Sequence, residues 1–318
     1  MSVGQLIRRI GSRRSLQAAG LLLALLAALT YFRFRVGTFW TTDNLLDLLR
    51  QSSINTILSV GMTFVILTAG IDLSVGSALC LSAIVVALVL RGGADATVAV
   101  LAGLGAGALC GSLNGTCIVA GRLAPFIVTL GTLWAFRGVG RWLCDDRTVQ
   151  IAGGTLSAVN RSEVLGIPMP AVLALLSVAL AHVVLTRTTF GRSVFAVGGS
   201  EEAAWLSGVR VGRVKMSVYA ISGLTAGLAA VVSTAKLGSG SPNVGVAYEL
   251  DAIAATVLGG TSLMGGEGSV AGTLVGAVFI QTLRKGMSMI PVEDYRQNIA
   301  IGVAIIIGAL VDRAMRSR

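Results

Sequence analysis

The 318-residue sequence contains little charge, few aromatic side chains and a single histidine, His182. Charged residues make up 13% of the chain and hydrophobic residues 54%, whereas a soluble globular protein carries about 25% charged residues. An ordinary soluble domain is therefore excluded, and the composition indicates a polytopic membrane protein. One histidine and four cysteines without a CxxC pair cannot supply a zinc site, so we expect no metal.

Two further absences concern nucleic acids and nucleotides. The net charge is +10, but lysine and arginine occur singly between apolar runs and form no basic face interleaved with aromatics. We therefore expect no nucleic-acid partner and interpret the charge as topological. The phosphate-cradling motif GxxxxGK[ST] does not occur, and the glycine-rich run at 259–269 lacks its lysine. No ATP site and no other cofactor is expected on this chain.

Long apolar runs fill most of the sequence. A membrane-spanning helix needs about 20 apolar residues, and ten segments fit that size, near residues 16–33, 52–70, 74–90, 95–115, 125–143, 168–186, 214–235, 249–264, 269–286 and 296–312. An even number of spans brings both basic tails to one side, and the positive-inside rule makes that side cytoplasmic. We predict an all-α, multi-pass membrane protein with one domain over 1–318, a cytoplasmic tail at 1–15 and an uncleaved first helix.

The sequence contains 41 glycines, and some of them are regularly spaced. Gly103, Gly107, Gly111 and Gly115 recur every fourth residue, which places them on one face of a helix. Pairs with the same spacing occur at Gly223 and Gly227, and at Gly272 and Gly276. Such bare faces let a second helix backbone approach closely. Close helix packing is the favoured interpretation, and lining of a translocation path is the alternative.

An aspartate, Asp72, interrupts two apolar runs within TAGIDLSVGSALCL (68–81). An ionisable group at bilayer depth is a candidate for function. Asp72 or Ser74 could equally cap the helix that follows, while Gly70 ends the helix before. We favour the cap and expect a tight helix-to-helix turn at the inner membrane side. Glu249 and Asp251 are interpreted similarly, as acids at the positive end of a helix.

The most informative polar segment is the predicted cytoplasmic loop 187–213. After Gly199, Ser200 is a good N-cap, and Glu201 and Glu202 suit the first turn of a helix. The helix continues through the residues Ala203, Ala204, Trp205 and Leu206, and Gly208 ends it. So short a helix is marginal alone in water, which favours docking on a partner; a solvated loop is the alternative.

Four stretches together resemble the permease subunits of ABC importers of the ribose, xylose and arabinose type. They are AGIDLSVGS (69–77), PFIVTLGT (125–132), FAVGGSEEAAWLSGV (195–209) and YELDAIAATVLGGTSLMGGEGSVAGTLVGA (248–277), in the order and spacing of that family. Two positions depart from its usual pattern: Ser200 stands where asparagine is usual, and Arg284-Lys285-Gly286 stands where Asn-Gly is common.

The resemblance implies a membrane subunit, not an enzyme, that passes a pentose or hexose into the cytoplasm of a bacterium across the inner membrane. Its implied partners are a separate ABC ATPase that binds ATP and Mg²⁺, a periplasmic sugar-binding protein, a second permease copy or similar subunit, and membrane lipid. By the same likeness, the helix from Ser200 to Gly208 is the coupling helix that contacts the ATPase, and Gly199 before it belongs to the same contact. The candidates for a helix turn or for the pathway are Asp72, Ser74, Gly76, Asn114 and Thr129.

Two other functions compete with this one. A secondary transporter driven by a proton or sodium gradient would use buried acids or histidines as relays, and mid-span charge is sparse here. An intramembrane serine hydrolase is suggested by Gly260 to Ser262 together with His182. It lacks an identifiable orienting group and oxyanion site.

Overall fold

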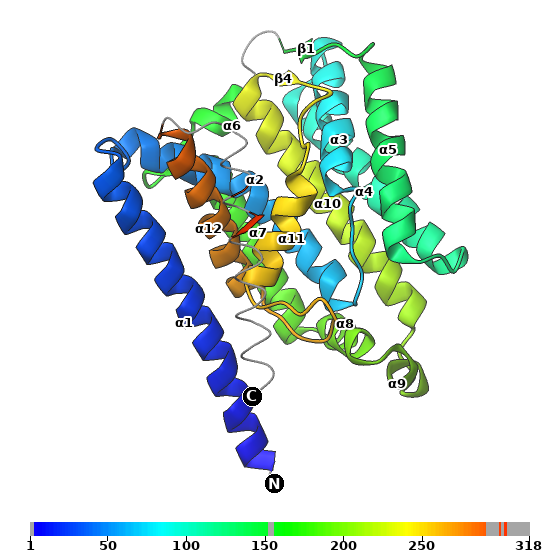
Figure 1. Cartoon of the computed structure of the whole chain (residues 1–318). Helices are drawn as coiled ribbons and strands as arrows, with labels where there is room; N and C mark the ends of the chain where they lie inside the picture. Colours follow the sequence, from blue (N-terminus) through cyan, green and yellow to red (C-terminus); the bar gives the residue numbers. More distant parts are fainter. Residues whose placement is uncertain (1–2, 152–155, 291–298, 300–301, 304–318) are drawn as a thin grey trace.

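A computed structural model describes residues 3–151, 156–290, 299 and 302–303 (Figure 1). The described part is mostly helical, and its helices are α1 (Val3–Arg35), α2 (Thr42–Leu67), α3 (Val75–Arg91), α4 (Ala96–Ala120), α5 (Pro125–Leu143), α6 (Ser157–Arg161), α7 (Met169–Arg187), α8 (Thr189–Gly199), α9 (Glu201–Leu206), α10 (Val211–Leu237), α11 (Tyr248–Leu258) and α12 (Val270–Ser288). Four two-residue strands complete it: β1 (Val149–Gln150), β2 (Glu163–Val164), β3 (Ile167–Pro168) and β4 (Ser239–Gly240).

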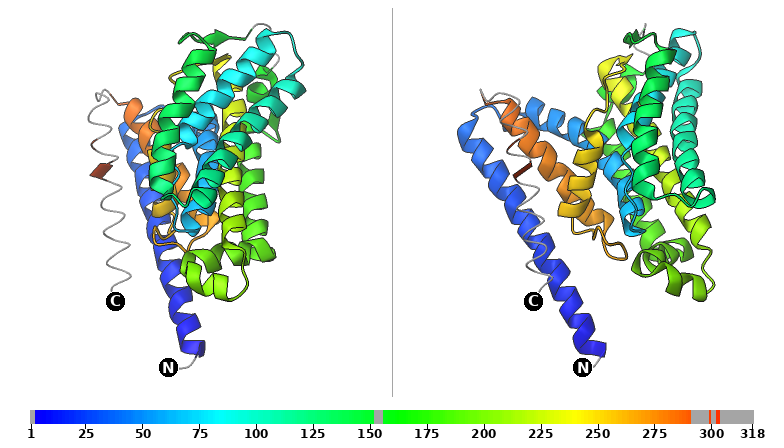
Figure 2. Two further views of the ribbon diagram at one scale, coloured as in Figure 1. Left: turned by 90° about the vertical axis from the view of Figure 1, so that its right-hand side faces the viewer. Right: turned by 45° about the vertical axis from the view of Figure 1, so that its right-hand side comes forward.

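Long helices lie side by side in one bundle, with α1 along its edge against α12 (Figure 2). The first turn of α1 lies at the same end of the molecule as α8 and α9, and β1 and β4 lie at the opposite end (Figure 1). Among the described helices, α4, α7 and α10 are both long and apolar enough to cross a membrane, and α3 is a shorter apolar helix. The helical, apolar architecture is the one expected of a polytopic membrane protein.

The centre of the bundle is α10, which packs against α4, α2 and α3. Its contact with α4 depends on glycine. A methyl group at Gly107 would overlap the carbonyl oxygen of Gly223, and one at Gly111 would overlap that of Tyr219. The two backbones therefore touch directly, as the glycine spacing predicted. The same holds for α12 against α11, where a methyl group at Gly276 would overlap the Ala255 carbonyl.

Seven of the predicted spans, from 16–33 through 214–235, correspond to α1, α2, α3, α4, α5, α7 and α10, and the span 269–286 corresponds to α12. The predicted span 249–264 is wrong, because its helix, α11, covers only 11 residues. At a rise of about 1.5 Å per residue it is roughly 16 Å long, about half of a bilayer core. Glycines interrupt it: Gly259 is the C-cap and Gly260 has a φ of +88°. The predicted span 296–312 lies almost wholly outside the described residues.

The polar stretch 144–167 contains short structured pieces. β1 pairs antiparallel with β4, with Val149 opposite Gly240, and β2 pairs antiparallel with β3. The β1–β4 pair fastens this stretch to the far end of α10, because β4 directly follows that helix. These strands are the only departure from an all-α fold within the described residues.

Candidate functional site

The short helix predicted in the loop 187–213 exists as α9. The Ser200 hydroxyl accepts a hydrogen bond from the Ala203 amide (3.2 Å), and Glu201 and Glu202 occupy the first turn. Gly208, with a φ of +84°, follows the last turn, as expected of a residue that ends a helix. The predicted cap, first turn and end of this helix are therefore confirmed.

The loop contains a second helix, α8, which the sequence reasoning missed. The side chain of Thr188 caps it by accepting from the Gly191 amide (3.1 Å), and Gly199 is its last residue. The buried residues Gly191, Val194, Val197 and Gly198 recur at helical spacing. That spacing after a threonine was the available signal. It was overlooked because the whole segment reads as polar.

One face of α9 is attached to the bundle and the other is bare. Ala204 is buried, and Glu201 forms an ion pair with Lys215 of α10. In contrast, Trp205 and Leu206 are 68% and 72% exposed. Helix α9 lies at the end of the molecule where α1 begins (Figure 1), so that end carries two large exposed apolar side chains. Adjacent exposed apolar side chains of this size at a polar end indicate a surface for another protein.

The base of α9, formed by Gly198 and Gly199 at the end of α8, is in contact with two other parts of the chain. The Gly266 amide, in the loop 259–269, donates a hydrogen bond to the Leu67 carbonyl at the end of α2 (2.9 Å). A methyl group at Gly198 would overlap that carbonyl, and one at Gly266 would lie 2.9 Å from the Gly199 amide. The glycine-rich run that lacks a phosphate-binding lysine is therefore a packing element. It joins the α8–α9 pair to α2, α11 and α12.

The second set of predicted residues surrounds Asp72, in the non-helical segment 68–74 between α2 and α3. One carboxylate oxygen of Asp72 accepts from the amide (2.9 Å) and the hydroxyl (2.7 Å) of Ser74, and the other accepts from the Ser222 hydroxyl (2.8 Å). The Asn114 amide donates to the Ser74 hydroxyl oxygen (2.7 Å). The Thr129 hydroxyl donates to the Ile71 carbonyl (3.1 Å). Helices α4, α5 and α10 thereby hold this segment in place.

The connection between α2 and α3 starts at the α9 end of the bundle, where Leu67 contacts Gly198 and Gly266, as expected of a turn at the inner membrane side. The expected cap by Asp72 or Ser74 is wrong, and Asp72 lies deeper in the bundle. Asp72 is 1% exposed, and its partner Ser222 lies about 16 Å along α10 from Val211, at a rise of roughly 1.5 Å per residue. Ser74 occupies the N-cap position of α3, but its side chain makes no cap hydrogen bond. Asp72 instead bonds to Ser74 itself. Ser74 and Ser222 of α10 satisfy its carboxylate, which sequence spacing could not show.

Gly76, the remaining candidate, packs elsewhere. A methyl group there would overlap the Gly245 carbonyl in the α10–α11 connection. The structure thus brings together Asp72, Ser74, Asn114 and Thr129, and places Gly76 beside a neighbouring contact. Ser222 was missed, although a serine within an apolar span was a visible signal.

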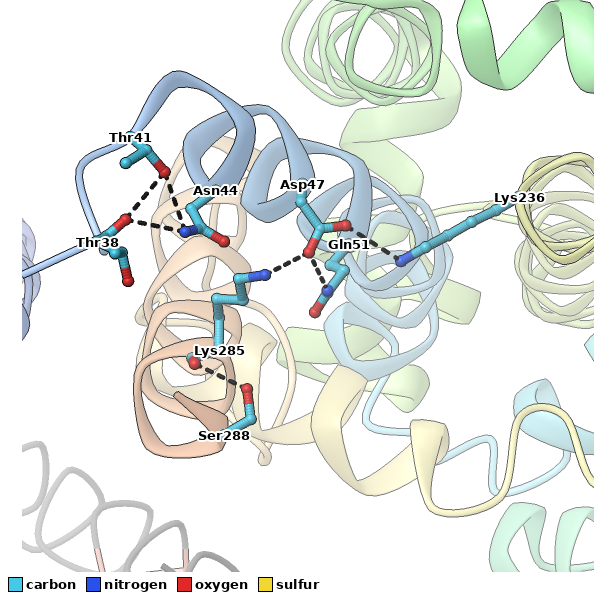
Figure 3. Close-up of polar contacts among 8 residues, drawn as sticks. All are labelled: Thr38, Thr41, Asn44, Asp47, Gln51, Lys236, Lys285 and Ser288. Carbon is cyan, nitrogen blue, oxygen red and sulfur yellow. Dashed lines mark hydrogen bonds and ion pairs between the residues drawn. The ribbon is translucent and has the colours of Figure 1, made fainter. Parts of the chain in front are cut away.

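A third polar group, also missed, lies at the end of the bundle opposite α9. Asp47 of α2 accepts from Lys285 of α12 (2.5 Å) and from Gln51 (2.8 Å), and Lys236 of α10 lies 3.9 Å away (Figure 3). Burial alone would raise the pKa of Asp47, but the hydrogen bond from Lys285 and the two lysine charges outweigh it and lower that pKa.

The unusual Arg284-Lys285 pair is explained by these contacts. Lys285 binds Asp47, and Arg284 forms an ion pair with Asp251 of α11 (2.6 Å). Both cations therefore have an acidic partner on another helix. Asp251 lies in the first turn of α11, as predicted.

Comparison with known proteins identifies the family. A family model described as the permease component of branched-chain amino acid transport systems matches residues 44–310. The ribose import permease protein RbsC of Bacillus subtilis is 43% identical over 272 residues, covering 85% of this chain and 84% of that protein. The D-allose permease AlsC of Escherichia coli is 38% identical, covering 86% and 85%, and the xylose permease XylH of that organism is 33% identical, covering 96% and 93%.

No solved structure gave a significant match. The family model nevertheless covers most of the chain, and the sugar permeases are matched over most of both lengths. The relatives are permease components and not enzymes. The chain is a membrane protein that belongs to the family of permease components of sugar ABC importers.

Proposed function

We propose that this chain is the membrane subunit of an ATP-driven importer that passes a monosaccharide from a periplasmic binding protein into the cytoplasm. ATP and Mg²⁺ bind to a separate ATPase below it, and a second permease copy completes the membrane part. The chain crosses the bacterial inner membrane several times, with both termini in the cytoplasm. Family membership and the sugar permeases among its relatives support this function over a gradient-driven transporter.

The observation that carries the proposal is α9. It is a capped helix with an anchored face, Ala204 and Glu201, and a bare face, Trp205 and Leu206. The bare face is the surface on which the ATPase docks. Because the loop 259–269 and the end of α2 contact the base of α9, a displacement of α9 moves three parts of the bundle together. ATP binding thereby shifts the population between outward-open and inward-open packings.

The test replaces the bare face without disturbing the anchored one. Trp205→Ala with Leu206→Ala removes exposed apolar contacts, so the permease folds normally. We expect sugar-stimulated ATP hydrolysis in proteoliposomes to fall at least about tenfold, because truncating an interfacial tryptophan commonly costs about 2 kcal/mol or more. The matched control is Trp142→Ala, which removes a 76% exposed tryptophan at the far end of α5.

A cross-linking experiment gives a second readout. A cysteine introduced at Trp205 should capture the ATPase subunit in native vesicles, and one introduced at Trp142 should not. Glu202→Lys is the cleaner charge variant, because Glu201 is engaged by Lys215. Unchanged hydrolysis in the double variant, or no ATPase captured through residue 205, would contradict the coupling role.

A further inference from the structure

A cavity of about 390 Å³ lies between α2, α10, α11 and α12. It is at the end of the bundle opposite α9, because Lys236, in the last turn of α10, lines it. This volume falls within the range of small-molecule sites, roughly 300–1,000 Å³. The coupling role of α9 makes no use of this space.

Three helices each direct one face towards the cavity. Gln51 and Asn55 of α2 are four residues apart, and Tyr248 and Asp251 of α11 are three apart. On α12 the lining residues are Gln281, Arg284 and Ser288. Residues at these spacings lie on one side of a helix. The polar lining is therefore a property of the helix faces and not of a loose loop.

Hydrogen-bonding capacity remains unused around this cavity. Asn55 is 4% exposed, and neither its amide nitrogen nor its amide oxygen has a hydrogen-bond partner among the described residues. The Nε of Arg284 also has none within that part of the chain. Buried polar groups in proteins are nearly always paired, and each exception calls for an explanation. A polar ligand that enters between these helices would supply the missing partners.

The charges that line the cavity are already engaged. Asp251 pairs with Arg284 (2.6 Å), and Lys236 lies 3.9 Å from Asp47, which also binds Lys285 (Figure 3). What remains for a ligand is chiefly the amides of Asn55 and Gln281. Gln51 adds its amide oxygen, because its nitrogen already donates to Asp47. A side-chain amide offers donors and an acceptor together, which is what a hydroxyl group needs. This chemistry favours a neutral polyol over an anion.

We propose that this cavity is a solute subsite of the permease itself, which holds a neutral, polyhydroxylated molecule of monosaccharide size through Asn55 and the neighbouring amides. The choice of solute class rests on the proposed function, whereas the site rests on the geometry above. The permease then contributes to selectivity instead of offering only a smooth path.

The first experiment is protection from a thiol reagent. In a Cys117→Ala background, which removes the exposed native cysteine, cysteine replaces Gln281 or, in a second variant, Ser288. Vesicles holding the permease alone are treated with a methanethiosulfonate reagent, with and without D-ribose, D-allose or D-xylose. We expect at least one sugar to slow modification of both variants. Asn243→Cys, at an exposed position outside the cavity, is the control and should react equally in both conditions.

The second experiment replaces the unpaired amide. Asn55→Leu keeps the size of the side chain but removes its hydrogen bonds, and we expect about a tenfold higher sugar concentration for half-protection, the effect of losing one good hydrogen-bonded contact. Asn44→Leu is the matched control, because its amide lies on the same helix but donates to Thr38 and Thr41. If Asn55→Leu does not fold, the two cysteine variants still decide the matter.

The outcomes separate this proposal from the importer function, because the labelling needs neither ATPase nor binding protein. Protection without ATP-driven uptake would support the subsite and contradict the proposed importer function. Uptake with no protection by any of the three sugars, or an unchanged half-protecting concentration in Asn55→Leu, would overturn the subsite. Protection by gluconate but by none of the neutral sugars would overturn the assigned solute class.

Discussion

At the scale of single residues, Asp72 is the most demanding group in the bundle. A buried carboxylate costs much free energy unless it is hydrogen-bonded. Asp72 meets this cost with three donors, the Ser74 amide, the Ser74 hydroxyl and the Ser222 hydroxyl. Because α3 begins directly after this segment, these bonds set where the helix starts. Asp72 is therefore a positioning residue for the interior of the permease.

Asp72→Asn tests that role. The amide keeps the shape but has one acceptor oxygen instead of two, so a serine hydroxyl that donates to Asp72 must turn to accept or lose its bond. We expect a loss of about 1–3 kcal/mol. Thermal unfolding in detergent should show a clear fall in the midpoint. Asp95→Asn is the control, since Asp95 is exposed and makes no cap hydrogen bond. Equal unfolding midpoints for the two variants would contradict the structural role of Asp72.

At the scale of elements, the contact between α4 and α10 depends on missing side chains. Gly107 and Gly111 face Gly223 and Tyr219 backbone to backbone. Lipid provides no hydrophobic force between helices, so dispersion at close approach stabilises such a pair. A carbon atom added at these positions would push the two helices apart, and the dispersion contacts along their length would be lost.

Gly111→Ala should therefore destabilise the permease although alanine favours helices. Overpacking typically costs about 1–3 kcal/mol, which would appear as a lower unfolding midpoint. Gly105→Ala is a control on the same helix, because a methyl group there meets nothing within 4 Å. It should leave the midpoint unchanged or raise it slightly. The reverse order of the two variants would contradict the packing argument.

At the scale of the whole molecule, two junctions connect distant parts of the chain. One joins α9 to α2 and to the loop 259–269 through glycine backbones. The other joins α2, α10 and α12 through Asp47, Lys236 and Lys285 (Figure 3). The two junctions lie at opposite ends of the bundle. Helix α2 takes part in both, because Asp47 lies near its start and Leu67 at its end. A movement received at α9 can in this way reach the cavity at the other end.

The Asp47 junction should make stability depend on pH. The lysines lower the pKa of Asp47 below its ordinary value of 3.8. A lowered pKa contributes stability that is present above the unfolded value and is lost as the pH falls through the folded value. The unfolding midpoint should thus fall below about pH 4. In Asp47→Asn the midpoint should be lower at neutral pH and less sensitive to acid.

Asp43→Asn is the control for this measurement, because Asp43 lies on the same helix and makes none of these contacts. Added salt should reduce the difference between wild type and Asp47→Asn, since the pair is partly exposed. An acid response that is identical in wild type and Asp47→Asn would exclude the junction as its cause.

Local signals were sufficient for several features. The lengths of the apolar runs gave most of the long helices, the spacing of Gly107 and Gly111 gave a close helix contact, and Ser200 with Glu201 gave α9. These succeed because each depends on residues within a few turns of one helix. The span at 249–264 failed because hydropathy does not register the glycines that end α11 at Leu258.

Hydropathy, glycine spacing and capping are local, so the order of the amino acids was enough to predict a helical membrane protein with a capped helix on a polar loop. The folded arrangement was needed to find that Asp72 is buried beside Ser222, that Asp47 joins Lys236 and Lys285, and that Asn55 lines a polar cavity. These depend on which helix faces meet. Partners such as Asp47 and Lys285, 238 residues apart, leave no trace in local spacing.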